Sequence, residues 1–236
     1  SGHVRVYHYS GGAWTQRGSD INGEAANDYS GNSVSLSSDG SILAVGAWLN
    51  DGNGSESGHV RVYQYSDSSW TQLGGDLDGE AAQDQLGYTV ALSSDGSILA
   101  AGARYNSGKG HVRVYQYSGS SWTQRGSDIN GDAVGDTLGT SVALSGDGLI
   151  LVAGTPNNDG NGFASGHVQA YRLVGPVFSS SRVFSIQEPQ TNLGTVTVVD
   201  VDSSTSAGNL TFSVVSGSEF YINPTAGVLS LTSRSD

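Results

Sequence analysis

The chain has 236 residues, 35 of them glycine, and its 22 acidic and 10 basic side chains give a formal net charge of −12. This length can bury one or two hydrophobic cores, and the surplus of carboxylates argues against binding nucleic acid or an anionic membrane surface. The absence of cysteine excludes disulfides and thiol chemistry. No apolar run approaches the ~18 residues of a membrane span, so we expect no membrane insertion.

A six-residue segment recurs along the first three quarters of the chain. Gly-His-Val-Arg-Val-Tyr occupies residues 2–7, 58–63 and 110–115, and an altered copy, Gly-His-Val-Gln-Ala-Tyr, occupies residues 166–171. The copies start 56, 52 and 56 residues apart. A repeat of about this length is typical of a propeller or solenoid, in which one unit cannot bury its apolar face alone.

The six-residue segment is one part of a longer repeat unit, and each complete unit is predicted to form four short strands. In the unit that contains residues 58–63, residues 33–37 alternate as a half-buried strand does. Residues 42–47 of that unit are apolar on both faces, as a strand between neighbouring blades should be. Asp39-Gly40 between them predicts a hairpin of type I′, with positive φ at both residues. The His-Val-Arg-Val-Tyr segment is the third strand. The fourth strand begins at a recurring tryptophan: Trp14, Trp70 and Trp122.

The repeats resemble the FG-GAP repeat of integrin-type propellers. The resemblance rests on the Asp-Gly hairpin followed by residues 43–47, on residues 86–90 and 138–142, and on Gly154-Thr155-Pro156, and it extends over about residues 1–173. In that family a calcium loop lies between the first two strands. Here this loop is only Ser-Asp-Gly-Ser, so the family's ligands are not carried over to it.

After residue 173 the repeats and tryptophans stop and β-branched residues dominate. Residues 176–178, 183–188 and 193–202, continued by residues 210–214 and 220–229, resemble the start of a cadherin-like domain. The resemblance implies interdomain calcium ligands at Glu188, Asp200 and Asp202. A complete sandwich of this type has roughly 100 residues, so we expect only part of one at residues 174–236.

Together these patterns predict an all-β chain with a propeller domain at residues 1–173 and a partial β-sandwich at residues 174–236. The propeller has three to four four-stranded blades whose ring is incomplete within the chain, because the first copy starts at its third strand and the last lacks its fourth. Unpaired strand edges bind other strands. With no methionine at position 1, we expect a segment of a longer chain. Its expected partners are other molecules of the same protein or the rest of a longer parent chain.

An acidic loop follows each fourth strand and is the first candidate metal site. Oxygen-bearing side chains recur there at relative positions 1, 3, 5 and 9, a spacing that can converge on calcium, which takes 6–8 oxygen ligands. The glycine falls at position 4 rather than at position 6, so a solvated turn between blades is the alternative. The residues are Asp20, Asn22, Glu24 and Asp28; Asp76, Asp78, Glu80 and Asp84; and Asp128, Asn130, Asp132 and Asp136.

A second candidate calcium loop contains Asp51 and Asn53 and is repeated at Asp159 and Asn161, where a flexible turn fits equally well. The four repeated histidines lie a whole blade apart, too far for one zinc site, and we interpret them as packing residues. The recurring tryptophans favour packing between blades over sugar stacking. No serine lies in a nucleophile elbow, so we predict no enzyme.

The sequence-based prediction of function is a non-enzymatic, extracellular or cell-surface protein of structural or adhesive type, a segment of a larger or filamentous assembly joined through open β-edges. The alternative is a propeller binding module whose loops capture a surface glycan or protein. Calcium is the one cofactor that the sequence suggests.

Overall fold

The computed structural model describes residues 1–173, 177–178, 198–199, 220–225 and 228–233. The chain divides into two compact units, Ser1–Leu173 and Val174–Asp236. Strands dominate the first unit, and its one helical turn among the described residues is the 3₁₀ turn η1, Asn106–Gly108. No helix among the described residues is long and apolar enough to cross a membrane.

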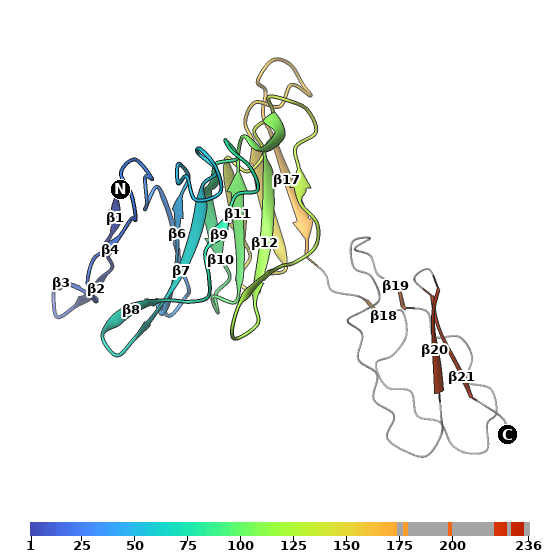
Figure 1. The fold of residues 1–236 in the computed structure, drawn as a ribbon, viewed down its shortest axis with the longest axis horizontal. Helices are drawn as coiled ribbons and strands as arrows, with labels where there is room; N and C mark the ends of the chain where they lie inside the picture. The colour runs from blue at the N-terminus through green and yellow to red at the C-terminus, as the bar shows by residue number, and fades with distance from the viewer. Residues whose placement is uncertain (174–176, 179–197, 200–219, 226–227, 234–236) are drawn as a thin grey trace. The chain divides into compact units, whose positions relative to one another are not determined.

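The first unit is a row of antiparallel blades that follow one another in sequence order (Figure 1). Blade 1 consists of β1 (His3–Val4), β2 (Tyr7–Ser10), β3 (Ala13–Gln16) and β4 (Ile21–Asn22). Blade 2 consists of β5 (Ser33–Leu36), β6 (Ile42–Ala47), β7 (His59–Ser66), β8 (Ser69–Gln72) and β9 (Leu77–Asp78). Blade 3 consists of β10 (Leu86–Leu92), β11 (Ile98–Ala103), β12 (His111–Tyr117), β13 (Trp122–Gln124) and β14 (Ile129–Asn130), and blade 4 of β15 (Ser141–Leu144), β16 (Ile150–Thr155) and β17 (His167–Arg172).

The all-β class and the blade-type organisation are thus confirmed, with one difference in strand number. The fourth strand of a blade is two pieces rather than one, and both pieces pair with the third strand: β8 and β9 each pair with β7, and β13 and β14 each pair with β12. A glycine with positive φ lies between the pieces, at Gly74 and Gly126. The chain can bend there because glycine has no Cβ.

The Asp-Gly hairpins differ from the predicted type I′ turn, because positive φ occurs at Gly40 but not at Asp39. The Asp39 carboxylate instead accepts hydrogen bonds from the hydroxyl of Ser37 and from the backbone N–H of Ser41. Asp95 and Asp147 accept the corresponding bonds in blades 3 and 4. The aspartate side chain therefore stabilises a longer turn, in which only the glycine needs a left-handed backbone conformation with positive φ.

The core lies between the blades. The second strands of blades 2 and 3 supply most of it, and every residue of β6 and β11 is buried. The backbones approach closely, since a Cβ on Gly46 would collide with the carbonyl oxygen of Gly87 in the next blade, and Gly102 and Gly139 repeat the contact. Tryptophans complete the joints, and the indole of Trp70 donates to the carbonyl oxygen of Arg17 in blade 1.

In the second unit the described strands form two antiparallel pairs. Strand β18 (Val177–Phe178) pairs with β19 (Val198–Val199), and β20 (Phe220–Thr225) pairs with β21 (Val228–Ser233). The predicted calcium ligands Glu188, Asp200 and Asp202 lie outside the described residues. The cadherin-like character of this unit therefore stays a prediction.

Candidate functional site

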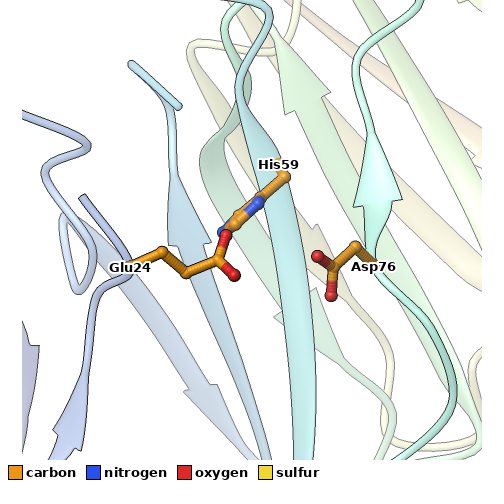
Figure 2. Close-up of side chains that lie close together, drawn as sticks. All are labelled: Glu24, His59 and Asp76. Atoms are coloured by element: carbon orange, nitrogen blue, oxygen red, sulfur yellow. The ribbon is translucent and has the colours of Figure 1, made fainter. Parts of the chain in front are cut away.

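The repeated histidine of blade 2 lies buried at the joint with blade 1. His59 begins β7, where its backbone pairs with Asp78 of β9, and only 4% of the residue is exposed. The strand places its side chain toward the first blade, and Figure 2 shows two carboxylates beside it. Glu24 comes from the loop after β4 of blade 1, and Asp76 precedes β9 of blade 2. One ligand atom from each of the three side chains lies within 4.8 Å of the other two.

An arginine already contacts both carboxylates of this group. The Arg61 guanidinium donates to Asp76 through Nε, at 2.8 Å, and through Nη2, at 2.7 Å, and it forms an ion pair with Glu24 of the preceding blade. Gln72 adds a bond of 2.6 Å to Asp76. The guanidinium thus joins two blades, and it holds the two acidic groups near the histidine by neutralising their charge.

The same arrangement recurs one blade further on. His111 begins β12, and it groups with Glu80 of blade 2 and Asp128 of blade 3, again with ligand atoms within 4.8 Å. Arg113 pairs with both acids. His111 is 1% exposed, neither of its ring nitrogens has a hydrogen-bond partner, and Nδ1 lies 3.9 Å from a carboxylate oxygen of Asp128. A buried polar group without a partner is uncommon and carries a free-energy cost. We call these two groups the His59 cluster and the His111 cluster.

Burial and charge set the protonation states at these clusters. Burial lowers the pKa of His59 and of His111, and the neighbouring arginine lowers it further, which favours the neutral imidazole. The hydrogen bond from Arg61 lowers the pKa of Asp76. At Asp128 burial raises the pKa, but the bonds from Arg113 and Gln124 outweigh burial and leave it lowered. Each cluster therefore offers a neutral nitrogen donor beside an ionised carboxylate.

The first and fourth copies of the histidine differ from these two. His3 is exposed, and Arg5 pairs with Asp20 alone among the described residues. His167 is exposed, and Gln169 stands in the position of the arginine. The two complete clusters lie at the joints between blades 1 and 2 and between blades 2 and 3, where both neighbours contribute side chains.

The side chains of each predicted acidic loop have different partners. Asp20, Asp76 and Asp128 accept from the arginine of their own blade, whereas Glu24 and Glu80 reach the arginine of the next blade. Asn22, Asp78 and Asn130 lie in the short strands that pair with the repeated histidines, and burial raises the pKa of Asp78. Asp132 is exposed, and its carbonyl accepts from Lys109.

The last acid of each loop supports the backbone. Asp28, Asp84 and Asp136 are buried, and their carboxylates accept the backbone N–H of Ala25, Ala81 and Ala133. In the other candidate loops, Asp51 and Asp159 accept backbone N–H groups within their own turns, Asn53 donates to the carbonyls of Gly79 and Glu80, and the Asn161 backbone donates to Ser165. Calcium binding by these loops stays a prediction.

Sequence reasoning found the acids but missed their meeting with the histidines. Each cluster takes its glutamate from the preceding copy, so a pattern read within one copy cannot reveal it. The histidine-to-aspartate spacing was the available signal, since Asp76 follows His59 and Asp128 follows His111 by the same 17 residues. The interpretation of the histidines as packing residues placed them beside the arginine and tyrosine of their own strand and left out the carboxylates of the acidic loops.

Comparison with known families supports the repeat. Residues 22–63 match the FG-GAP repeat family, which confirms the FG-GAP-like part of the resemblance over that stretch. No curated protein matches the chain.

Solved structures with a similar fold include a protein described as a 6-phosphogluconolactonase from Bacteroides uniformis, 15% identical over 72% of this chain and 43% of its own, with a TM-score of 0.48. The periplasmic gluconolactonase of Pseudomonas aeruginosa is 18% identical over 71% of this chain and 45% of its own, with a TM-score of 0.47. A mitotic checkpoint complex chain is 16% identical over 60% of this chain and 37% of its own, with a TM-score of 0.40. The chain spans less than half the length of each of these structures.

These neighbours contradict the predicted function. Two of the three are described as lactonases, which are enzymes, and nothing in the comparisons supports an adhesive or filament-forming protein. The predicted structural or adhesive role is therefore wrong; it was derived from the open strand edges together with the FG-GAP-like and cadherin-like resemblances. At these identities the likeness concerns the fold, and lactonase activity is not transferred to this chain. What the comparisons establish is an FG-GAP repeat at residues 22–63.

Proposed function

We propose that this propeller binds divalent transition-metal ions at the joints between its blades, one in the His59 cluster and one in the His111 cluster. The observation that carries the proposal is the state of His111. Its two ring nitrogens are buried without a hydrogen-bond partner, and two carboxylates from different blades converge on them. A metal ion would satisfy one nitrogen and draw the carboxylates together.

The donor set suits such an ion. Imidazole nitrogen with carboxylate oxygens binds zinc, manganese or cobalt, whereas calcium prefers oxygen ligands alone. Ligand atoms around tetrahedral zinc lie roughly 3.4 Å apart, given bonds of about 2.0–2.2 Å. The ligand atoms of each cluster lie within 4.8 Å of one another, so small side-chain movements would complete the site.

The arginine of each cluster must leave the carboxylates before a metal ion can bind them. Arg61 and Arg113 neutralise the carboxylates in this structure, and a divalent ion beside a guanidinium would be repelled. Binding therefore requires that the guanidinium turn toward solvent as the ion enters. Glu24 and Glu80 are solvent-exposed members of the two clusters, so an incoming ion can reach their carboxylates from solvent.

Isothermal titration with Zn²⁺ tests the proposal. We expect two sites in the unaltered protein, one site in either single variant, His59→Gln or His111→Gln, and none when both are combined. His3→Gln is the matched control, because it changes the same repeat position where no complete cluster exists.

Thermal melting of each variant without metal checks that it folds, and Glu80→Gln offers a second route to the His111 cluster from the neighbouring blade. Absence of heat with the unaltered protein, or zinc binding that the double histidine variant retains, would refute metal binding at these joints.

A further inference from the structure

Five residues near one end of blades 2 and 3 break the repeat and gather in one place. They are Tyr29, Trp48, Tyr88, Arg104 and Tyr105, and we call them the aromatic ridge. Aligned on the repeat, Tyr29 corresponds to Gln85 and Thr137, Trp48 to Arg104 and Pro156, Tyr88 to Asn32 and Thr140, and Tyr105 to Leu49 and Asn157. Packing between blades recurs in every copy, so it does not account for residues that only one or two copies carry.

The ridge is continuous from blade 2 to blade 3. The rings of Tyr29 and Trp48 lie 5.9 Å apart, and those of Trp48 and Tyr88 lie 5.7 Å apart. The Arg104 guanidinium then lies 4.0 Å from the ring centre of Tyr88 and 4.6 Å from that of Tyr105. Tyr29 and Tyr105 are 55% and 45% exposed. The ridge thus presents aromatic rings to solvent at both ends, with a cation between them.

Arg104 differs in its partners from the repeated arginines Arg5, Arg61 and Arg113. Its Nε donates to the side chain of Gln85, at 3.0 Å, and no carboxylate pairs with it among the described residues. Cation–π contacts hold the guanidinium in place, while its Nη groups have no protein acceptor in the part of the chain that the structure describes. A guanidinium that is held in place and has N–H groups without an acceptor binds a carboxylate well.

Polar groups next to this guanidinium can also bind hydroxyls. Gln85 donates to a carboxylate oxygen of Glu56, at 3.2 Å, which leaves the other Glu56 oxygen as an acceptor beside the ridge. The Trp48 indole N–H is buried and has no hydrogen-bond partner. Small-molecule sites combine aromatic walls with a few placed polar groups in this way.

We propose that the aromatic ridge binds a small acidic sugar. Its carboxylate accepts hydrogen bonds from the Nη groups of Arg104, and the apolar face of its ring lies against Tyr105. The hydroxyls bond to polar groups around Gln85 and Glu56. A neutral sugar lacks the group that Arg104 binds, and a simple carboxylate lacks the ring face, so neither satisfies the whole ridge.

Saturation-transfer NMR with glucuronate as the probe tests this inference, with methyl glucoside as the neutral counterpart. We expect transfer to glucuronate and little to methyl glucoside. The Arg104→Gln variant should weaken glucuronate binding about tenfold or more, since a charge-assisted pair is lost. Tyr105→Ala should reduce the transfer while keeping the cation.

Arg172→Gln is the matched control, because Arg172 is exposed and lies outside the ridge. Circular dichroism and thermal melting confirm that each variant folds. No transfer to glucuronate, equal transfer to methyl glucoside, full displacement by equimolar acetate, or unchanged binding in Arg104→Gln would overturn the inference. None of these outcomes depends on metal at the two histidine clusters.

Discussion

The indole nitrogen of Trp122 in blade 3 donates a hydrogen bond to the carbonyl oxygen of Leu73 in blade 2, at 2.9 Å. Trp122 is 8% exposed, whereas its counterpart Trp14 in blade 1 is 69% exposed. The recurring tryptophan therefore joins one blade to the blade before it, and its contribution to stability should depend on whether that joint is formed.

Replacing the tryptophan by phenylalanine should cost stability at the buried Trp122 and little at the exposed Trp14. Trp122→Phe keeps a ring in the joint but leaves the Leu73 carbonyl unpaired, and we expect a loss of about 1–3 kcal/mol in the free energy of unfolding. Trp14→Phe should stay within about 0.5 kcal/mol of the unaltered protein. Urea unfolding followed by circular dichroism measures both, and equal effects would argue against the joint.

The close backbone approach at Gly102 predicts a large effect from a single methyl group. A Cβ there would collide with the carbonyl oxygen of Gly139 in blade 4, so the blades must separate. We expect Gly102→Ala to cost about 3 kcal/mol or more, because overpacking at a backbone contact cannot relax. Gly75→Ala is the control, since the position is open and its φ is ordinary. Matching melting temperatures for the two variants would be inconsistent with this packing.

The hairpin aspartates predict a loss of stability in acid. The hydroxyl of Ser37, followed by the N–H and hydroxyl of Ser41, lowers the pKa of Asp39 from 3.8 to about 2. A serine hydroxyl and a backbone N–H likewise lower the pKa of Asp95 and of Asp147, and a second serine hydroxyl adds to the effect at Asp95. A lowered folded-state pKa contributes stability that is present above the unfolded-state pKa and is lost as the pH falls through the folded-state value.

Urea midpoints at about pH 5 and about pH 2.5 test this pH dependence. The midpoint of the unaltered protein should fall between these two conditions. A variant with Asn at all three hairpin positions should start lower and fall less, because it has no carboxylate to protonate there. Parallel decreases in the two proteins would exclude the hairpins as a source of acid sensitivity.

The arginine in each histidine cluster should compete with metal. Without metal, Arg113→Gln leaves Glu80 and Asp128 facing each other, and we expect a loss of about 2 kcal/mol or more in stability. The same change removes the positive charge that opposes a divalent ion, so Zn²⁺ should bind the His111 cluster about tenfold more tightly. Arg5→Gln, in the exposed blade 1 copy, should change neither quantity much. If Zn²⁺ binds Arg113→Gln no better than the unaltered protein, the arginine does not compete.

The blades could be predicted from the sequence because their strands follow from local patterns. The buried run at residues 42–47 and the His-Val-Arg-Val-Tyr segment became β6 and β7 as expected. The turn at Asp39-Gly40 was predicted in place but not in type, because the aspartate side chain stabilises an alternative turn. The split fourth strand followed from a glycine that no strand pattern reveals.

The candidate site was much harder to predict than the fold. Glu24 and His59 are 35 residues apart and belong to different blades, so only the packing of one repeat on the next brings them together. The aromatic ridge was missed for the opposite reason. A search for residues that recur does not find Trp48 and Arg104, because they occupy the same repeat position but are chemically unlike.

Anomalous X-ray scattering from crystals grown with Zn²⁺ tests metal binding at the blade joints most directly. We expect a peak among Glu80, His111 and Asp128 and a second among Glu24, His59 and Asp76, with Arg61 and Arg113 turned away from the carboxylates. Clusters without a peak, with both arginines still paired to their acids, would contradict this expectation.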